Sequence, residues 1–289
     1  MKVIVAKKCG FCPGVRNAIS TAEKILKEEK EVYSLGAIIH NDDVVERLAD
    51  NGLKTVESIE EITSGTVLIR SHGAAPAQVA RLRERGLNIV DATCVLVKRV
   101  QQIAEQLGNS GYEVVVMGDR NHPEVQAVVG CVADVMVIAD ESDVHNLPRN
   151  GKLGIVCQTT QTPEYFGRMV GAIIREGFGE LKVINTLCKE AIKRQESAVQ
   201  LCRKVDVMFV LGGLESANTR KLAELCKKYN NQTFHLQSWA KFDKRMVFGK
   251  SAAGVAAGAS TPDRVISEFV EQLTALDSGC IARLADRKD

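Results

Sequence analysis

Residues 94–124 read CVLVKRVQQIAEQLGNSGYEVVVMGDRNHPE, and the layout of this stretch decides the fold. Cys94 opens a helical pattern, and a Val-rich run then ends at Gly118, before a polar turn and a second helical pattern. Counted from Cys94, the glycine comes after 24 residues, His122 after 28 and Glu124 after 30. A short apolar run that ends at a turn and is followed by a helix is typical of a strand in a parallel sheet.

The same layout occurs twice more along the chain, at the same three intervals. The equivalent residues are Cys12, Gly36, His40 and Asp42 in the first copy, and Cys188, Gly212, Ser216 and Asn218 in the last. Repetition of one supersecondary unit predicts a repeated architecture. We therefore predict an α/β protein of three similar units with parallel sheets, arranged pseudo-threefold around a centre.

A second repeated pattern runs from a strand through a polar turn and a proline into a helix. It occurs as IRSHGAAP (69–76), VCQTTQTP (156–163) and AAGASTP (256–262). Proline favours the first helical turn, because its missing N–H would have no helical partner there. His72, Thr159 and Ser260 lie in the polar turns, at the strand ends where open parallel sheets bind their ligands.

The repeat also predicts the domain organisation. We place boundaries near residues 95 and 190, which gives units at 1–95, 96–190 and 191–264. Residues 265–289 have no counterpart in the repeat, and we expect them to pack back on the first unit. Because no linker rich in Gly, Ser or Pro separates the units, we expect one compact body.

Composition excludes several classes of protein. The chain has 289 residues, 45% of them hydrophobic, and a formal net charge of +2 without a long basic run. Nucleic acid and anionic membranes are therefore not expected partners. No apolar run approaches the roughly 20 residues of a spanning helix. The first residues, MKVIVAKKCG, are too short an apolar stretch for a signal peptide, so we expect a cytoplasmic protein.

Nine scattered cysteines, an odd number, indicate metal binding rather than a disulfide framework. Three units around one axis would bring Cys12, Cys94 and Cys188 together at the centre. Three thiolates suit an iron–sulfur cluster or zinc. The cluster is favoured because the repeated histidines come 28 residues later, on another loop. A four-iron cluster normally takes four cysteines, so one iron would stay open to substrate.

Other interpretations apply to residues around this centre. Cys9-x-x-Cys12 resembles a thioredoxin-type redox pair, although only Cys12 belongs to the repeat. Glu124 could be an acid favoured by a helix dipole, but its place after His122 and Pro123 favours proton transfer. We expect the remaining cysteines to be buried or incidental thiols. They are Cys131, Cys157, Cys202, Cys226 and Cys280.

Taken together, these segments resemble the 4-hydroxy-3-methylbut-2-enyl diphosphate reductase family of the methylerythritol phosphate route to isoprenoids. The matching segments, in family order, are GFCPGVRNAI (10–19), GAIIHNDDVVERL (36–48), IRSHGAAP (69–76), DATC (91–94), NHPEV (121–125), QTTQ (158–161), SANT (216–219) and AGASTPD (257–263). The resemblance implies a three-lobed fold around one oxygen-sensitive [4Fe–4S] cluster per chain, held by Cys12, Cys94 and Cys188.

The resemblance also implies a reaction and its residues. The reaction is a two-electron reductive dehydroxylation that forms isopentenyl and dimethylallyl diphosphate, with electrons from ferredoxin or flavodoxin. Glu124 would supply protons, and Thr159 would bind and orient the substrate hydroxyl. The implied diphosphate contacts are His40, His72, His122, Ser216, Asn218 and Ser260.

The chain departs from the family pattern around these segments. The departures are Val95, Ala127, Val128, Glu190, Ala191, Leu214, Glu215 and Ala217. We expect them to lie around the site, where they leave open a related cluster-dependent reductase that acts on another small anionic substrate. A non-catalytic iron–sulfur sensor is a further alternative. The presence of both Glu124 and Thr159 argues against it, because a sensor needs no proton donor.

Overall fold

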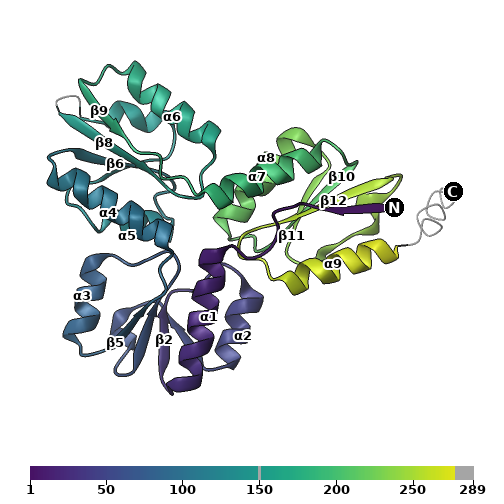
Figure 1. The fold of residues 1–289 in the computed structure, drawn as a ribbon, viewed down its shortest axis with the longest axis horizontal. Coiled ribbons are helices and arrows are strands. Elements are labelled where there is room, and N and C mark those ends of the chain that lie inside the picture. The colour runs from purple at the N-terminus through teal and green to yellow at the C-terminus, as the bar shows by residue number, and fades with distance from the viewer. Residues whose placement is uncertain (149–150, 277–289) are drawn as a thin grey trace. The chain divides into compact units, whose positions relative to one another are not determined.

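The computed structural model describes residues 1–148 and 151–276. Within these ranges the strands form three four-stranded sheets, and every strand pair is parallel. Helices flank each sheet (Figure 1). The prediction of three similar α/β units with parallel sheets is confirmed.

The first complete sheet has the strand order β3-β2-β4-β5. Its elements are α1 (Pro13–Glu28), β2 (Val32–Leu35), α2 (Asp42–Asp50), β3 (Leu53–Val56), the 3₁₀ helix η1 (Ile59–Glu61), β4 (Thr66–Ile69), α3 (Pro76–Glu84) and β5 (Asn88–Asp91). The central strand β4 is buried along its whole length, which explains the apolar run that follows Thr66 in its sequence. Helices α1 and α2 are joined by an ion pair between Glu23 and Arg47 (2.7 Å).

The second sheet has the equivalent order β7-β6-β8-β9. Its elements are α4 (Val95–Asn109), β6 (Glu113–Met117), α5 (Pro123–Val129), β7 (Met136–Ile138), η2 (Glu141–Asn146), β8 (Lys152–Cys157), α6 (Pro163–Arg175) and β9 (Glu180–Val183). Apolar clusters cover both of its faces. This sheet and the first belong to one compact unit, residues 13–39 and 45–188, which we call the central unit.

The third sheet has the order β1-β12-β10-β11. Its elements are β1 (Lys2–Val5), α7 (Lys189–Cys202), β10 (Val207–Leu211), α8 (Ala217–Tyr229), β11 (Thr233–Leu236), η3 (Trp239–Lys241), η4 (Lys244–Val247), β12 (Ala252–Ala257) and α9 (Asp263–Ala275). Residues 1–12, 40–44 and 189–276 belong to a second compact unit, which we call the discontinuous unit.

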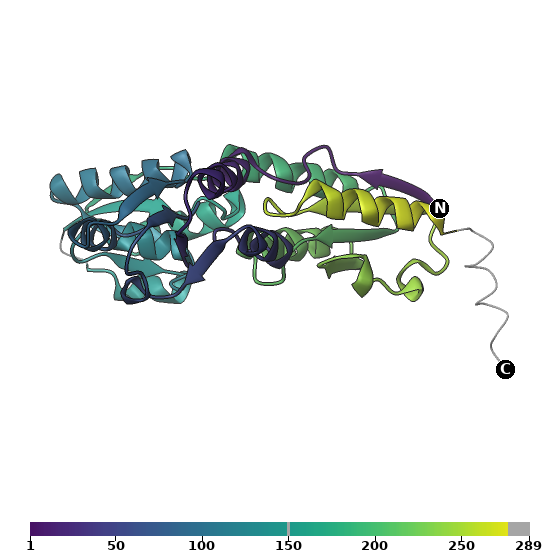
Figure 2. The ribbon, with the colours of Figure 1, turned by 90° about the horizontal axis from the view of Figure 1, so that it is seen from below.

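The first strand corrects the expected boundary of the first unit. Instead of joining the sheet of residues 32–91, β1 pairs with β12, with Lys2 opposite Ala252 and Val5 opposite Val255. Sequence patterns locate a strand but not its partner, and β12 offers an apolar strand that is buried from Ala253 to Ala257. Helix α9 lies beside β1 and β12 (Figure 1, Figure 2). Residues 277–289 of the expected tail lie outside the described residues.

The repeated glycines end equivalent strands in all three sheets. The backbone N–H of Gly36 donates to Val56, that of Gly118 to Ile138 and that of Gly212 to Leu236, with N···O distances of 2.8, 2.9 and 3.0 Å. The repeat found in the sequence is therefore also a repeat of backbone geometry. No helix in the described part of the chain is both long and apolar enough to span a bilayer.

Candidate active site

Each repeated cysteine is held by the same backbone hydrogen bond. The N–H of Cys12 donates to the carbonyl of Ala259 (3.1 Å), that of Cys94 to Ser71 (3.0 Å) and that of Cys188 to Thr159 (2.8 Å). Each of the three acceptors lies two residues beyond the end of a central strand, β12, β4 or β8. The three cysteines thus occupy equivalent places at the carboxyl ends of the three sheets, and all three are half-buried thiols rather than disulfides.

Three of the predicted diphosphate contacts meet in the discontinuous unit. Ser216 caps α8, because its Oγ accepts hydrogen bonds from the N–H (3.4 Å) and the hydroxyl (3.0 Å) of Thr219. The hydroxyl of Ser260 donates to the carbonyl oxygen of His40 (3.2 Å) and lies 3.4 Å from Ser216 Oγ. Both serines are buried and His40 is half-buried. The carboxyl ends of β10 and β12 therefore carry a group of small hydroxyl donors at a helix N-terminus.

Two glycines allow this close packing. A Cβ atom on Gly258 would overlap Thr219 Oγ1, and one on Gly213 would lie 3.0 Å from the carbonyl oxygen of His40. Any side chain at these positions would push α8 or the His40 segment away from the strand ends. Glycine at both positions therefore keeps the serine hydroxyls and the His40 backbone in contact.

Asn218 gives this group the character of an anion site. Its Nδ2 is buried and has no hydrogen-bond partner among the described residues. Leaving a buried donor unsatisfied costs about 1–3 kcal/mol. An anionic ligand would remove this cost, and the N-terminus of α8 adds N–H groups and partial positive charge.

Glu124 and Thr159 form the polar centre of the central unit. The Glu124 side chain is 2% exposed. Its Oε1 accepts the backbone N–H of Thr159 (2.6 Å) and its Oε2 accepts the Thr159 hydroxyl (2.8 Å). A buried carboxyl is tolerated only with such partners. Since Thr159 also binds the N–H of Cys188, the carboxyl is linked through one residue to a candidate metal ligand.

The two histidines of the central unit lie side by side. Their rings, from His72 and His122, meet edge to face with centroids 5.4 Å apart. His122 caps α5, since its Nδ1 accepts the N–H of Glu124 (3.2 Å). His72 follows Ser71, whose carbonyl holds Cys94. This unit therefore combines two imidazoles, one carboxyl and one hydroxyl near two strand-end cysteines.

Two residues that no sequence motif singles out support these groups. On α4, Gln101 donates from Nε2 to the carbonyl oxygens of Ala74 (3.1 Å) and Ala127 (3.3 Å), and so ties the His72 loop to helix α5. Arg194 on α7 is 4% exposed and donates to the carbonyl of Ala257 at the end of β12 (3.0 Å). Both occupy inward-facing positions of helices, and that pattern alone usually predicts apolar packing.

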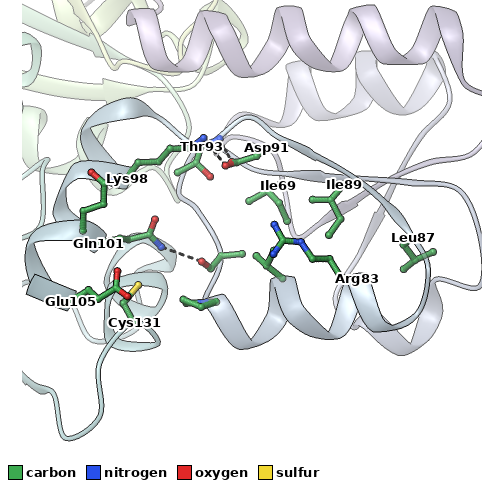
Figure 3. A pocket seen from close by; sticks show the side chains of 14 residues that line it. Ile69, Arg83, Leu87, Ile89, Asp91, Thr93, Lys98, Gln101, Glu105 and Cys131 are labelled. Carbon is green, nitrogen blue, oxygen red and sulfur yellow. Dashed lines mark hydrogen bonds and ion pairs between the residues drawn. The ribbon is translucent and has the colours of Figure 1, made fainter. Parts of the chain in front are cut away.

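A hollow of about 550 Å³ lies beside Gln101 and is distinct from the candidate site (Figure 3). Its floor contains Ile69 and Ile89, and Arg83 and Lys98 reach in from helices on either side. The repeated cysteines and the histidines do not line it.

The cysteines outside the repeat do not resemble ligands. Burial raises the pKa of the Cys9 thiol to about 11, so that it stays protonated at neutral pH. Cys131 is half-buried, and burial raises its pKa to about 11 as well. Cys157, Cys202 and Cys226 are buried, and Cys280 lies outside the described residues.

Several departures from the family pattern have side chains that are exposed or paired at the surface. Val95, the first residue of α4, is 76% exposed, and Leu214 is 49% exposed. Glu190 forms an ion pair with Lys8 (3.1 Å). Their place around the site therefore stays a prediction. First-turn side chains of a helix can point away from the ligand that its backbone faces.

The fold and these residues define a class: an α/β protein of three parallel-sheet units, each with a cysteine held at a strand end. The family model described as LytB protein matches residues 3–274, and the chain belongs to this family. Its members are iron–sulfur oxidoreductases.

Curated relatives cover almost the whole chain. The 4-hydroxy-3-methylbut-2-enyl diphosphate reductase of Pelobacter propionicus is 42% identical over 274 residues, 94% of this chain and 98% of the relative. The enzyme of the same name from Geobacter sp. (strain M21) is 42% identical over 284 residues, 98% of this chain and all of the relative.

Two solved structures share the fold. A structure of (E)-4-hydroxy-3-methyl-but-2-enyl diphosphate reductase is 40% identical, with a TM-score of 0.71, and the match covers 96% of this chain and 100% of that one. The E-1-hydroxy-2-methyl-but-2-enyl-4-diphosphate reductase of Plasmodium falciparum is 26% identical, with a TM-score of 0.90. The match covers 95% of this chain and 88% of that one.

Proposed function

We propose that this protein reduces 4-hydroxy-3-methylbut-2-enyl diphosphate to isopentenyl and dimethylallyl diphosphate, the last step of the methylerythritol phosphate route. The observation that carries the proposal is the backbone hydrogen bond that recurs at all three strand-end cysteines. Family membership and the names of the relatives point to the same reaction. The overall change consumes two electrons and two protons and releases one water.

The chain's own residues fit the cofactor that this reaction needs. Cys12, Cys94 and Cys188 would hold one [4Fe–4S] cluster, since their thiols are half-buried and occupy equivalent backbone positions. When bound, the cluster would supply electrons. The iron that no protein residue binds would act as a Lewis acid and would be open to the substrate hydroxyl. The raised pKa of Cys9 fits its exclusion from the ligand set.

The diphosphate would be held by neutral donors instead of a cluster of cations. The proposed contacts are His40, His72, His122, Ser216, Asn218 and Ser260. Hydrogen bonds to a charged group contribute roughly 1.5–3 kcal/mol each. The unsatisfied Nδ2 of Asn218 supports this assignment, because an anion would complete its hydrogen bonding.

Glu124 and Thr159 would handle the proton. The Thr159 hydroxyl would orient the substrate hydroxyl, and the Glu124 carboxyl, in its protonated form, would donate to the oxygen that leaves as water. The two hydrogen bonds between these residues support the assignment, since they fix the carboxyl and the hydroxyl side by side.

The source of electrons and the location are also part of this proposal. Ferredoxin or flavodoxin would deliver the electrons one at a time. A cytoplasmic location would suit thiolate ligands, because reducing compartments keep cysteines from forming disulfides.

One observation favours a second candidate, a cluster-dependent reductase for another small anion. The exposed carboxyl of Glu215 directly precedes Ser216, the cap of the anion group. A negative charge there would weaken the binding of a diphosphate more than that of a singly charged ligand.

An anaerobic assay distinguishes the two candidates. Protein purified without oxygen should consume the diphosphate substrate with reduced methyl viologen as electron donor, and both isopentenyl and dimethylallyl diphosphate should appear. Absence of turnover by protein that carries close to a full cluster would reject the proposed reaction. In that case the Glu215→Ala variant would be assayed with the diphosphate substrate in the same way. If this variant is also inactive, the second candidate, a reductase for another small anion, is favoured.

A further inference from the structure

A basic surface in the discontinuous unit is not used by the proposed chemistry. It consists of Lys7 and Lys8, in the segment that leaves β1, and of Lys189 and Lys193, at the start of α7. All four residues are exposed. We call these four residues the lysine surface.

Glu190 fixes the geometry of the lysine surface. Its carboxylate lies 3.1 Å from Lys8 Nζ and 3.7 Å from Lys193 Nζ. The backbone N–H of Lys8 also donates to Ser197 Oγ on α7 (3.3 Å). Four lysines and one glutamate leave a net charge of +3 (4 − 1). The next acidic residue of α7 after Glu190 is Glu196, which lies one turn beyond Lys193.

The position of the lysine surface in the chain links it to the entry of electrons. Lys8 precedes Cys12 by four residues, and Lys189 directly follows Cys188. Electron transfer between proteins falls off steeply with distance, so a carrier must dock close to the ligands of the acceptor. A basic surface attracts and orients an acidic partner before contact.

We propose that the lysine surface is the docking site of a small acidic protein that carries one electron. This inference rests on the proposed function, because only a redox enzyme needs such a partner. Each docking oxidises one reduced carrier by one electron, and two successive dockings supply the two electrons that the reaction consumes. Redox encounters bury little surface, and exposed ion pairs are individually weak, so the oxidised carrier can leave quickly.

Charge reversal tests the docking site. The double variant Lys7→Glu/Lys189→Glu removes the two lysines that make no ion pair in the described part of the chain. Glutamate at 189 would begin α7, where an acid is favoured by the helix dipole. The matched control is Lys24→Glu/Lys30→Glu, which makes the same change of charge in and just beyond the last turns of α1.

Two electron sources separate docking from catalysis. With reduced flavodoxin, KM for the carrier should rise at least tenfold in the Lys7→Glu/Lys189→Glu variant and stay unchanged in the control. With reduced methyl viologen, which needs no protein docking site, turnover in both variants should stay within twofold of wild type. Equal KM for flavodoxin in the two variants would overturn the proposal, and so would a parallel loss of viologen-driven turnover.

Binding provides a readout that does not depend on turnover. Titration calorimetry of wild type with flavodoxin should show an affinity that falls with added salt, and this dependence should be weaker in the Lys7→Glu/Lys189→Glu variant. Carbodiimide cross-linking should join flavodoxin carboxylates to Lys7 or Lys189. Cross-links confined to other lysines would overturn the docking site. A wild type that binds flavodoxin here but shows no viologen-driven turnover would instead reject the proposed reaction.

Discussion

Glu124→Gln separates the chemical role of this carboxyl from its structural role. In the wild type, Oε1 and Oε2 of Glu124 accept hydrogen bonds from the N–H and the hydroxyl of Thr159, at 2.6 and 2.8 Å. Glutamine has the same shape, so its amide oxygen can accept the N–H while its amide NH₂ donates to the Thr159 hydroxyl oxygen. The variant therefore keeps both contacts and loses only their charge assistance, and we expect a destabilisation of about 1 kcal/mol.

The expected effect on turnover is much larger. An amide cannot donate a proton as a carboxylic acid does, and acid–base catalysis typically contributes about 10²–10⁴-fold. Anaerobic turnover with methyl viologen should fall by that factor, while iron content and substrate affinity stay near wild type. Substrate affinity would be measured by calorimetry on the oxidised protein, which does not turn over.

A second substitution at the same position controls for structure. Glu124→Ala leaves two Thr159 donors buried without an acceptor, which we expect to cost roughly 2–6 kcal/mol, at about 1–3 kcal/mol each. This variant should show a lower melting temperature than Glu124→Gln. If Glu124→Gln turns over at the wild-type rate, the carboxyl is only the first-turn acid of α5, and the proton comes from water or from the diphosphate.

The remaining predictions test the cluster, the anion group and the support of the site. Replacing any one of the three strand-end cysteines with serine should remove the brown colour and most of the iron, while Cys9→Ser should keep both; loss of iron only in Cys9→Ser would show that the repeat is misaligned. Ser216→Ala should weaken diphosphate binding roughly tenfold, as expected for one charge-assisted hydrogen bond, and unchanged affinity in calorimetry would place the site elsewhere. Gln101→Leu should lower kcat more than Gln102→Leu at its exposed neighbour, because only Gln101 joins the His72 loop to α5; equal kcat values would leave Gln101 without a positioning role.

Much of the architecture could be predicted because the repeat is local. Each copy contains a strand, a glycine, a polar turn and a helix start within about thirty residues, and local patterns of this kind follow from backbone geometry and side-chain periodicity. The placement of β1 could not be predicted in this way. Its partner β12 lies 250 residues away along the chain, and no local signal chooses between the open edges of three similar sheets.

The candidate site was predictable to a similar extent. The sequence pointed separately to Glu124 and Thr159, and the structure adds the two hydrogen bonds that join them. The ion pair of Glu190 with Lys8 could not be predicted, because the direction of a first-turn side chain depends on what packs against that helix. Glu190 can therefore lie two residues after Cys188 in the sequence and still form an ion pair at the surface.

The pairing of β1 with β12 also sets an order for folding. During synthesis, residues 13–188 leave the ribosome before residues 252–257 exist, so the central unit can form while β1 still has no partner. Cys12 lies seven residues beyond the end of β1, and its backbone hydrogen bond goes to Ala259, which is made later still. Of the three repeated cysteines, Cys12 comes first in the chain and is thus the last to be fixed, so a cluster held by all three, as proposed, would assemble only after almost the whole polypeptide has been made.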